Sequence, residues 1–247
     1  MSHKPKKENI CIRVPKVYDW VTRQVDLPLI SFTGKQLNQL KFDCDLEPCG
    51  DNGHIRNICE FLEREGIDDV IVDCFLSDRY GNRIDPKKDN GVLCQEIIQP
   101  NGREEVKVKL PDGDEVTLQK VKVLLKGFVG IELLSHNGEV LCHLDEGIPF
   151  ATAQTFFLCA PKGTEVNCHL SFFECDASLI CTDDFEQLDI SITLCIEVQM
   201  EAYVKIEVEG KFCEPRPELP ISPVLCSTEK FPPQCPDVFP NDDRKDC

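Results

Sequence analysis

The sixteen cysteines of this chain are the residues with the widest choice of chemistry. A thiol can ligate a metal, act as a nucleophile or form a disulfide, and cysteine spacing helps to separate these uses. Structural zinc sites commonly bring cysteines in pairs about two to four residues apart. The chain has no CxxC, and its closest pairs are Cys44/Cys49, Cys168/Cys175 and Cys175/Cys181. This spread favours disulfides formed after assembly, or scattered buried thiols, and we predict neither a bound metal nor a cofactor.

Six cysteines are predicted to form cross-links because the sequence places them outside a packed core. One lies on the polar N-terminal segment, one on the polar side of a long alternating segment, and four on a proline-rich C-terminal stretch: Cys11, Cys195, Cys213, Cys226, Cys235 and Cys247. The alternative for Cys195 is a thiol covered by a neighbouring element. The C-terminal thiols could bond to the body, bond to another subunit, or stay free. Cys168, in contrast, is expected to be buried on one face with Val166, Leu170 and Phe172.

Two Cys-His dipeptides, Cys142-His143 and Cys168-His169, offer a weaker zinc hypothesis. Adjacent residues of a strand point to opposite faces, so one dipeptide cannot easily supply both side chains to one ion. The acidic runs Asp43/Asp45/Glu47 and Asp183/Asp184/Glu186 lack the pattern of a calcium-binding EF-hand. We interpret these runs as solvated loops.

Catalytic signatures are missing from the sequence, which has no GxSxG, HExxH, GxxxxGK[ST] or GxGxxG. Sixteen cysteines and five histidines produce many chance Cys-His pairs, so no such pair indicates a catalytic dyad. We therefore expect a protein that is not an enzyme.

Hydrophobic alternation indicates that strands dominate the fold. The even positions from Leu188 to Val208 are all apolar, and a strict period of two is typical of a strand with one buried face. At about 3.3 Å per residue such a strand is unusually long, so it must bend or break. Asp112-Gly113 predicts a hairpin between alternating flanks. The apolar phase changes between Leu118 and Val121, which predicts a β-bulge.

The remaining elements are predicted from shorter signals. Residues 16–36 are expected to form one or two strands, with a short helix over 17–25 as the alternative. A helix is predicted over 51–66, capped by Asp51 or Asn52 and ended by Gly66. A buried strand is predicted over 70–76.

The fold class expected is all-β: an antiparallel β-sandwich or jelly-roll-like body with one short helix. A flexible N-terminal arm over residues 1–15, or alternatively a first edge strand, precedes a body over 16–212. A sub-domain boundary is possible near residue 100. An extended Pro/Cys-rich tail over 213–247 follows, because proline stiffens the chain and removes backbone donors.

The net charge of −17 makes nucleic acid and anionic lipid poor partners. No apolar run of about 18 residues is present, so we expect no insertion into a membrane. The N-terminal segment lacks an apolar signal-peptide core, which predicts synthesis in a cytoplasm. A reducing cytosol does not favour disulfides, and the high cysteine content then requires later oxidation.

The segment ICIRVPKVYDWVTRQVDLPL, residues 10–29, together with the acidic, cysteine-rich and β-rich composition, resembles cysteine-rich coat and exosporium proteins of endospore-forming bacteria. The resemblance implies synthesis in the mother-cell cytoplasm, deposition on the spore surface and cross-linking there. It implies other spore-surface proteins as partners, and it adds no catalytic residue.

We therefore predict a self-assembling structural subunit of a disulfide-cross-linked layer or fibre, whose main partner is itself. One alternative is a non-catalytic adaptor that docks other coat proteins or carbohydrate. A second is a metal-binding or redox-active cysteine protein.

Overall fold

The computed structural model describes residues 8–44, 54–55, 57–67, 69–86, 91–109, 113–182 and 184–210. The chain divides into two compact units. The described part of the first consists of residues 8–16 and 203–210, and the second unit runs from Val17 to Ala202. The domain boundaries predicted from the sequence stay a prediction.

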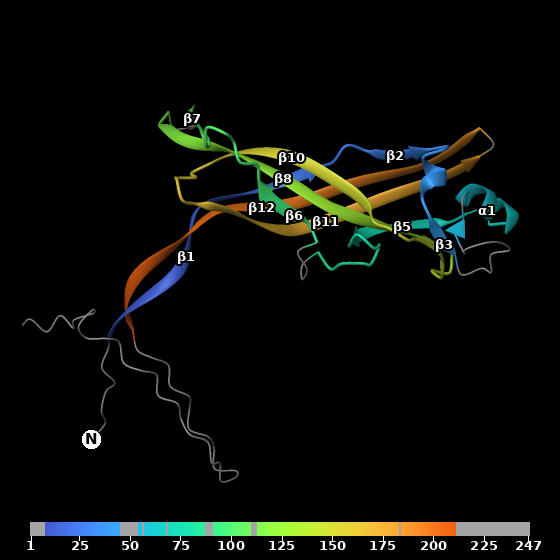
Figure 1. The fold of residues 1–247 in the computed structure, drawn as a ribbon, viewed down its shortest axis with the longest axis horizontal. Coiled ribbons are helices and arrows are strands. Elements are labelled where there is room, and N and C mark those ends of the chain that lie inside the picture. Colours follow the sequence, from blue (N-terminus) through green and yellow to red (C-terminus); the bar gives the residue numbers. More distant parts are fainter. Residues whose placement is uncertain are drawn as a thin grey trace, which may run out of the picture. The chain divides into compact units, whose positions relative to one another are not determined.

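Strands make up most of the described chain (Figure 1). Up to residue 96 the chain forms β1 (Glu8–Asp26), β2 (Ile30–Thr33), the 3-10 turn η1 (Leu37–Gln39), β3 (Phe42–Cys44), β4 (His54–Ile55), α1 (Ile58–Arg64), β5 (Ile71–Ser77) and β6 (Leu93–Glu96). After residue 103 it forms β7 (Glu104–Lys109), β8 (Glu115–Leu134), β9 (Val140–Leu144), β10 (Ile148–Leu158), β11 (Glu165–Thr182) and β12 (Phe185–Gly210). The predicted all-β, antiparallel, sandwich-like fold with a single short helix is confirmed for the described residues.

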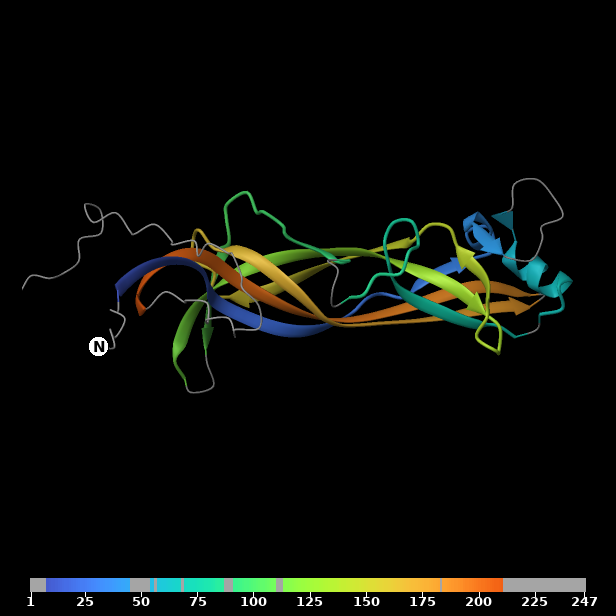
Figure 2. The ribbon, with the colours of Figure 1, turned by 90° about the horizontal axis from the view of Figure 1, so that it is seen from below.

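The long alternating segment forms one strand, β12, as its period of two predicts. It pairs with β1, β2 and β11, and the even-numbered side chains from Leu188 to Met200 are buried. Figure 2 shows β12 (orange) running alongside β11 (gold) and β1 (blue). Because successive side chains of a strand point to opposite faces, these even-numbered residues all lie on one face of β12 and form one continuous side of the hydrophobic core.

A second long strand, β8, organises the other half of the sheet by pairing with β5, β6, β7, β9 and β10. Its buried odd-numbered residues, among them Val121, Val123 and Ile131, belong to the same hydrophobic core as those of β12. The predicted hairpin of β7 and β8 around Asp112-Gly113 is confirmed by their antiparallel register. Asp112 itself lies outside the described residues.

The β-bulge predicted between Leu118 and Val121 is wrong. The register of β7 with β8 is unbroken from Glu104↔Lys120 to Lys109↔Glu115, and the pairing of β10 with β8 is continuous through the same region. The apolar phase changes because the two ends of β8 cover opposite faces. Leu118 is half-buried at its pairing with Val106 in the β7 hairpin, whereas Val121 enters the main core.

A real register shift occurs in β11, between Leu170 and Phe172. Half-buried positions of β11 are even-numbered before this shift and odd-numbered after it. The extra residue thereby rotates the second half of the strand. The predicted shared face of Cys168, Val166 and Leu170 is half-buried, but Phe172 does not belong to it, since Phe172 is 47% exposed.

The predicted helix is shorter than expected. It begins after Asn57, whose extended backbone and side-chain oxygen cap the N–H groups of Cys59 and Glu60 at 3.0 and 3.2 Å. Ile55 lies in β4 and not in the helix, whereas the expected capping residues Asp51 and Asn52 lie outside the described residues. Gly66 follows the helix with φ of 67°, as its role in ending the helix predicts.

Residues 16–36 form strands and not the alternative helix, and the predicted strand over 70–76 corresponds to β5. Only the C-terminal half of β5, from Phe75 to Ser77, is buried. Residues 8–15 of the expected flexible arm lie in β1, which matches the edge-strand alternative. Within the described residues, no helix has the length and apolar character needed to cross a membrane.

Candidate functional site

Four disulfides join eight cysteines of the described chain, and three of the four converge on β11. Cys168 bonds Cys94 of β6, Cys175 bonds Cys74 of β5, and Cys181 bonds Cys59 of α1. The register shift in β11 explains how an even-numbered and two odd-numbered cysteines can serve one side of the strand. For these eight residues the disulfide interpretation of the cysteine spacing is confirmed.

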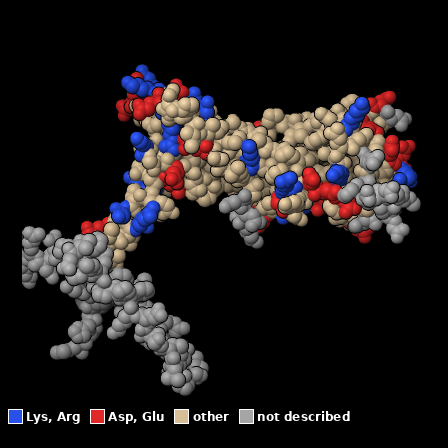
Figure 3. All heavy atoms as spheres, in the orientation of Figure 1, with Lys and Arg blue, Asp and Glu red and all other residues tan. Residues whose placement is uncertain are grey.

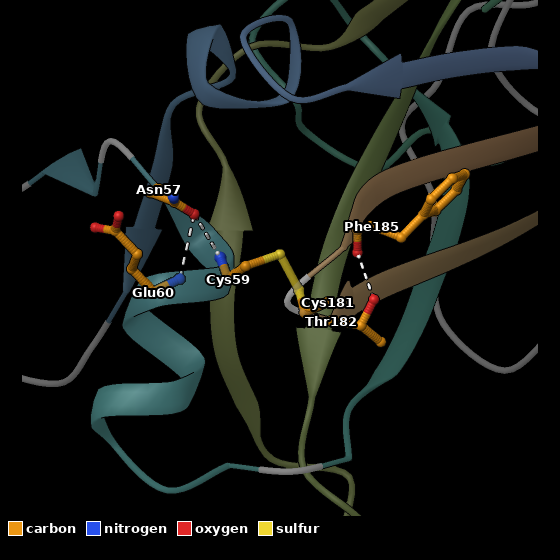
Figure 4. The surroundings of a disulfide bond; sticks show 6 residues. All are labelled: Asn57, Cys59, Glu60, Cys181, Thr182 and Phe185. Atoms are coloured by element: carbon orange, nitrogen blue, oxygen red, sulfur yellow. Dashed lines mark hydrogen bonds between the residues drawn. A yellow bond between two sulfur atoms is a disulfide. The ribbon is translucent and has the colours of Figure 1, made fainter.

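The bonds on β11 are nested in sequence, because each lies inside the loop that the next one closes. Their sequence separations are 74, 101 and 122 residues, from the innermost bond to Cys59–Cys181. Figure 4 shows this outermost bond, which ties the first turn of α1 to the end of β11, next to a hydrogen bond from Thr182 to the Phe185 carbonyl. Helix α1 is only seven residues long, so packing and this bond hold it, since helices of that length are marginal in isolation.

The fourth disulfide, Cys44–Cys142, joins β3 to β9 at directly paired positions. Both cysteines are buried, whereas their neighbours Asp43 and His143 are exposed on the opposite face. The zinc hypothesis for Cys142-His143 therefore fails at the cysteine, which is bonded to sulfur. Cys168-His169 fails in the same way.

Three described cysteines carry free thiols: Cys11, Cys159 and Cys195. Cys11 is exposed on β1, and Cys195 is half-buried on β12, where its carbonyl accepts a hydrogen bond from Ser171 at 3.2 Å. Cys11 and Cys195 were predicted cross-linkers, and that role stays a prediction. The other four candidates, Cys213, Cys226, Cys235 and Cys247, lie outside the described residues.

Cys159 is an exposed thiol that the sequence patterns did not single out. It follows the last residue of β10 and precedes an Ala-Pro-Lys-Gly turn, and its backbone N–H donates to the Asp19 carboxylate at 2.7 Å. The signal available in the sequence was the Pro-Lys-Gly turn, which is typical of a surface loop.

A charged anchor, also not predicted, surrounds Arg103 in the segment between β6 and β7. The guanidinium binds both carboxylate oxygens of Glu96 at 2.7 and 2.8 Å. Its remaining donors reach the Ala160 carbonyl at 3.0 Å, and the hydroxyl and carbonyl of Thr164, both at 2.8 Å. All five guanidinium N–H groups are therefore used within the protein.

This anchor lines a surface hollow near the β10–β11 turn, with a volume of about 540 Å³. A hollow whose arginine is already saturated lacks a free donor for an anionic ligand at that position. The hydrogen bonds instead hold the β10–β11 turn to the β6–β7 segment. We interpret the anchor as structural.

Acidic and histidine residues occupy one row of directly paired positions across the sheet. Directly paired residues on β11, β5, β8, β9, β3 and β4 are Asp176, Asp73, Glu132, His143, Asp43 and His54. Arg83 contacts two of these, Asp73 and Glu132, and its guanidinium carbon lies 3.7 Å from the centre of the Phe75 ring. On the face in Figure 3, positive and negative described residues are interspersed.

Hydrogen bonding perturbs one carboxyl in the β2–β12 pair. Ser31 donates to Asp189 at 2.5 Å, and this bond lowers the pKa of the Asp189 carboxyl below its ordinary value of 3.8, with a second contribution from Gln187. Asp189 is half-buried, and the bond links directly paired residues of β2 and β12.

In comparisons with known proteins, no protein-family model, no curated protein and no solved structure matches this chain.

Proposed function

We propose that this protein is a non-catalytic structural subunit that associates with further copies of itself and is sealed into a layer or fibre by intermolecular disulfides. The observation that carries the proposal is the division of its cysteines. Eight of them bond across the body, and the exposed thiols of Cys11 and Cys159 have no sulfur partner within the described chain.

This division suits an assembly that is oxidised. A small-molecule disulfide that serves as oxidant for the four internal bonds can also oxidise exposed thiols. The thiolate of one subunit displaces one small thiol from it, and the thiolate of a second subunit then displaces the other, which leaves a disulfide between the subunits. The internal bonds satisfy the eight body cysteines, so the exposed ones react between chains without disturbing the fold. The C-terminal cysteines Cys213, Cys226, Cys235 and Cys247 belong to the same proposal on their sequence positions alone.

The unit formed by residues 8–16 and 203–210 supports self-association. Arg13 of β1 lies 4.6 Å from the Tyr203 ring of β12, so the odd-numbered residues of the two paired strands share one face. Apolar side chains line the opposite face: Ile10, Ile12, Val14, Val204, Ile206 and Val208.

Two of these side chains, Ile206 and Val208, are 40% and 36% exposed. A two-stranded ribbon is marginally stable in water and gains stability when another element covers its apolar face. A second copy supplies such a face by symmetry, which fits the proposed homotypic assembly. The spore surface as its location rests on the resemblance of residues 10–29.

Electrophoresis of the purified, oxidised protein with and without reductant, together with electron microscopy, tests this function. We expect covalent multimers that collapse to a 28.0 kDa band on reduction, and ordered particles on the grid. Cys11→Ser and Cys159→Ser should each weaken the multimer ladder. Cys195→Ser tests the half-buried thiol in the same assay.

The matched control is the paired variant Cys59→Ala/Cys181→Ala, which loses an internal bond and should keep the multimers. A monomer that reductant does not change, with no particles, would contradict the proposal. That result would favour the adaptor alternative, a module that forms stable complexes with other proteins or carbohydrate without self-assembly.

A further inference from the structure

We propose that Asp43, His143 and Asp145 form a binding site for a divalent transition-metal ion, with Zn²⁺ as the ion of best fit. These three residues each offer one ligand atom, and the three atoms lie within 4.8 Å of one another. An imidazole with two carboxylates is a donor set that zinc accepts. The site goes beyond the proposed structural function.

The strand register builds this cluster. Asp43 of β3 is paired directly with His143 of β9, so the two side chains stand side by side on one face of the sheet. Asp145 lies in the bend just after β9, and its backbone N–H donates to the Lys41 carbonyl at 3.0 Å, which holds it beside the start of β3. The residue set opposite Asp43 on the other side, in β4, is a second histidine, His54.

A covalent bond holds the two strands in this register. Cys44–Cys142 joins the residues next to Asp43 and His143, and it lies on the buried face directly behind them. Sliding β3 along β9 would require breaking this disulfide. The ligand backbones are therefore fixed before any ion arrives, which lowers the ordering cost of binding.

The distances are close to those of a coordinated ion. His143 Nε2 lies 3.9 Å from Asp43 Oδ2. Two ligand atoms about 2.1 Å from a tetrahedral zinc ion are about 3.4 Å apart. Both side chains are about half exposed, at 51% and 52%, so rotation about their χ angles can close the difference and water can complete the coordination.

Zinc is favoured over calcium and magnesium because those ions prefer oxygen ligands, and an imidazole nitrogen suits transition metals. The sequence places Asp43 in an acidic run with Asp45 and Glu47 that we interpret as solvated. Its strand pairing instead brings it to a histidine 100 residues away.

The test is isothermal titration of the oxidised full chain with zinc chloride alone, after the free thiols have been alkylated and bound metal has been removed by a chelator. Alkylation is needed because free cysteines also bind zinc. We expect one zinc ion per chain. His143→Gln and Asp43→Asn should each weaken binding at least tenfold, since even the loss of a residue that only supports a ligand costs about 10–100-fold.

The matched control is His136→Gln. His136 Nε2 lies 3.9 Å from Asp69 Oδ2, the same separation as in the proposed site, but among the described residues no third ligand joins that pair. This variant should bind zinc as the parent does. Urea unfolding midpoints of all variants check that the exposed substitutions leave the fold intact.

The proposal is overturned if the alkylated parent binds no zinc, or if His143→Gln and Asp43→Asn bind it as tightly as the parent does. Zinc binding by an alkylated chain needs no intermolecular disulfide. The metal site and the cross-linking function can therefore fail separately.

Discussion

The nested disulfides predict a specific stability cost for removing the outermost bond, Cys59–Cys181. In the chain-entropy description, a disulfide stabilises the fold by lowering the conformational entropy of the unfolded chain, and the effect grows with the length of the loop that it closes. A bond that closes an isolated loop of 122 residues adds about 5 kcal/mol to the free energy of unfolding. Cys74–Cys175 already closes 101 of those residues. The additional loop is then only about 21 residues long, which corresponds to about 3 kcal/mol.

The variant is Cys59→Ala/Cys181→Ala, compared with the parent by urea unfolding after alkylation of the free thiols. We expect a loss of about 3 kcal/mol under oxidising conditions. The same comparison with all disulfides reduced measures the packing change alone, and we expect a much smaller difference there. A loss below about 1 kcal/mol would refute the entropic account. A loss near 5 kcal/mol would show that Cys74–Cys175 does not shorten the loop that the removed bond closes.

Two further predictions concern charged groups. Arg103→Lys should lower the free energy of unfolding by about 2–4 kcal/mol, because lysine cannot replace the two-pronged contact with Glu96 or the other donors, and these side chains are only 15% and 21% exposed. Lys120→Met should cost less than about 1 kcal/mol, because its pair with Glu104 is more exposed, at 31% and 61%. Equal urea midpoints for the two variants would contradict the structural role of the Arg103 anchor. Ser31→Ala should raise the pKa of Asp189 toward its ordinary value in an NMR titration. Because folding lowers the pKa of Asp189, this carboxylate stabilises the fold above its unfolded pKa, and the effect is lost as pH falls through the folded pKa. A titration curve that Ser31→Ala leaves unchanged would contradict the role of the hydrogen bond.

Periodicity in the sequence predicted the strands well, because a strand with one buried face has an apolar residue at every second position, and this pattern is visible locally in the sequence. The even positions from Leu188 to Met200 are buried as that record implies. The same local record misled at Leu118, where a phase change came from a second buried face and not from a bulge. Whether an extra residue exists depends on the partner strand, which local periodicity does not contain.

The candidate sites were less accessible to sequence reasoning, because they depend on long-range pairing. Nothing near Cys168 or Cys181 in the sequence identifies Cys94 or Cys59 as their partners, 74 and 122 residues away. Asp43 and His143 likewise become neighbours only through the pairing of β3 with β9. Arg103 carries no local motif, and its importance follows from carbonyl groups beyond β10.

The bond between Cys59 and Cys181 has a mechanical consequence for a subunit pulled from its two ends. Tension entering through β1 and leaving through β12 takes the shortest covalent route, which passes from Cys59 directly to Cys181. The 122-residue stretch between them is bypassed and carries no load along its backbone. Up to about 400 Å of chain, at about 3.4 Å per residue, is thereby withheld from extension. The oxidised subunit would therefore extend by that much less under force than the same chain after reduction.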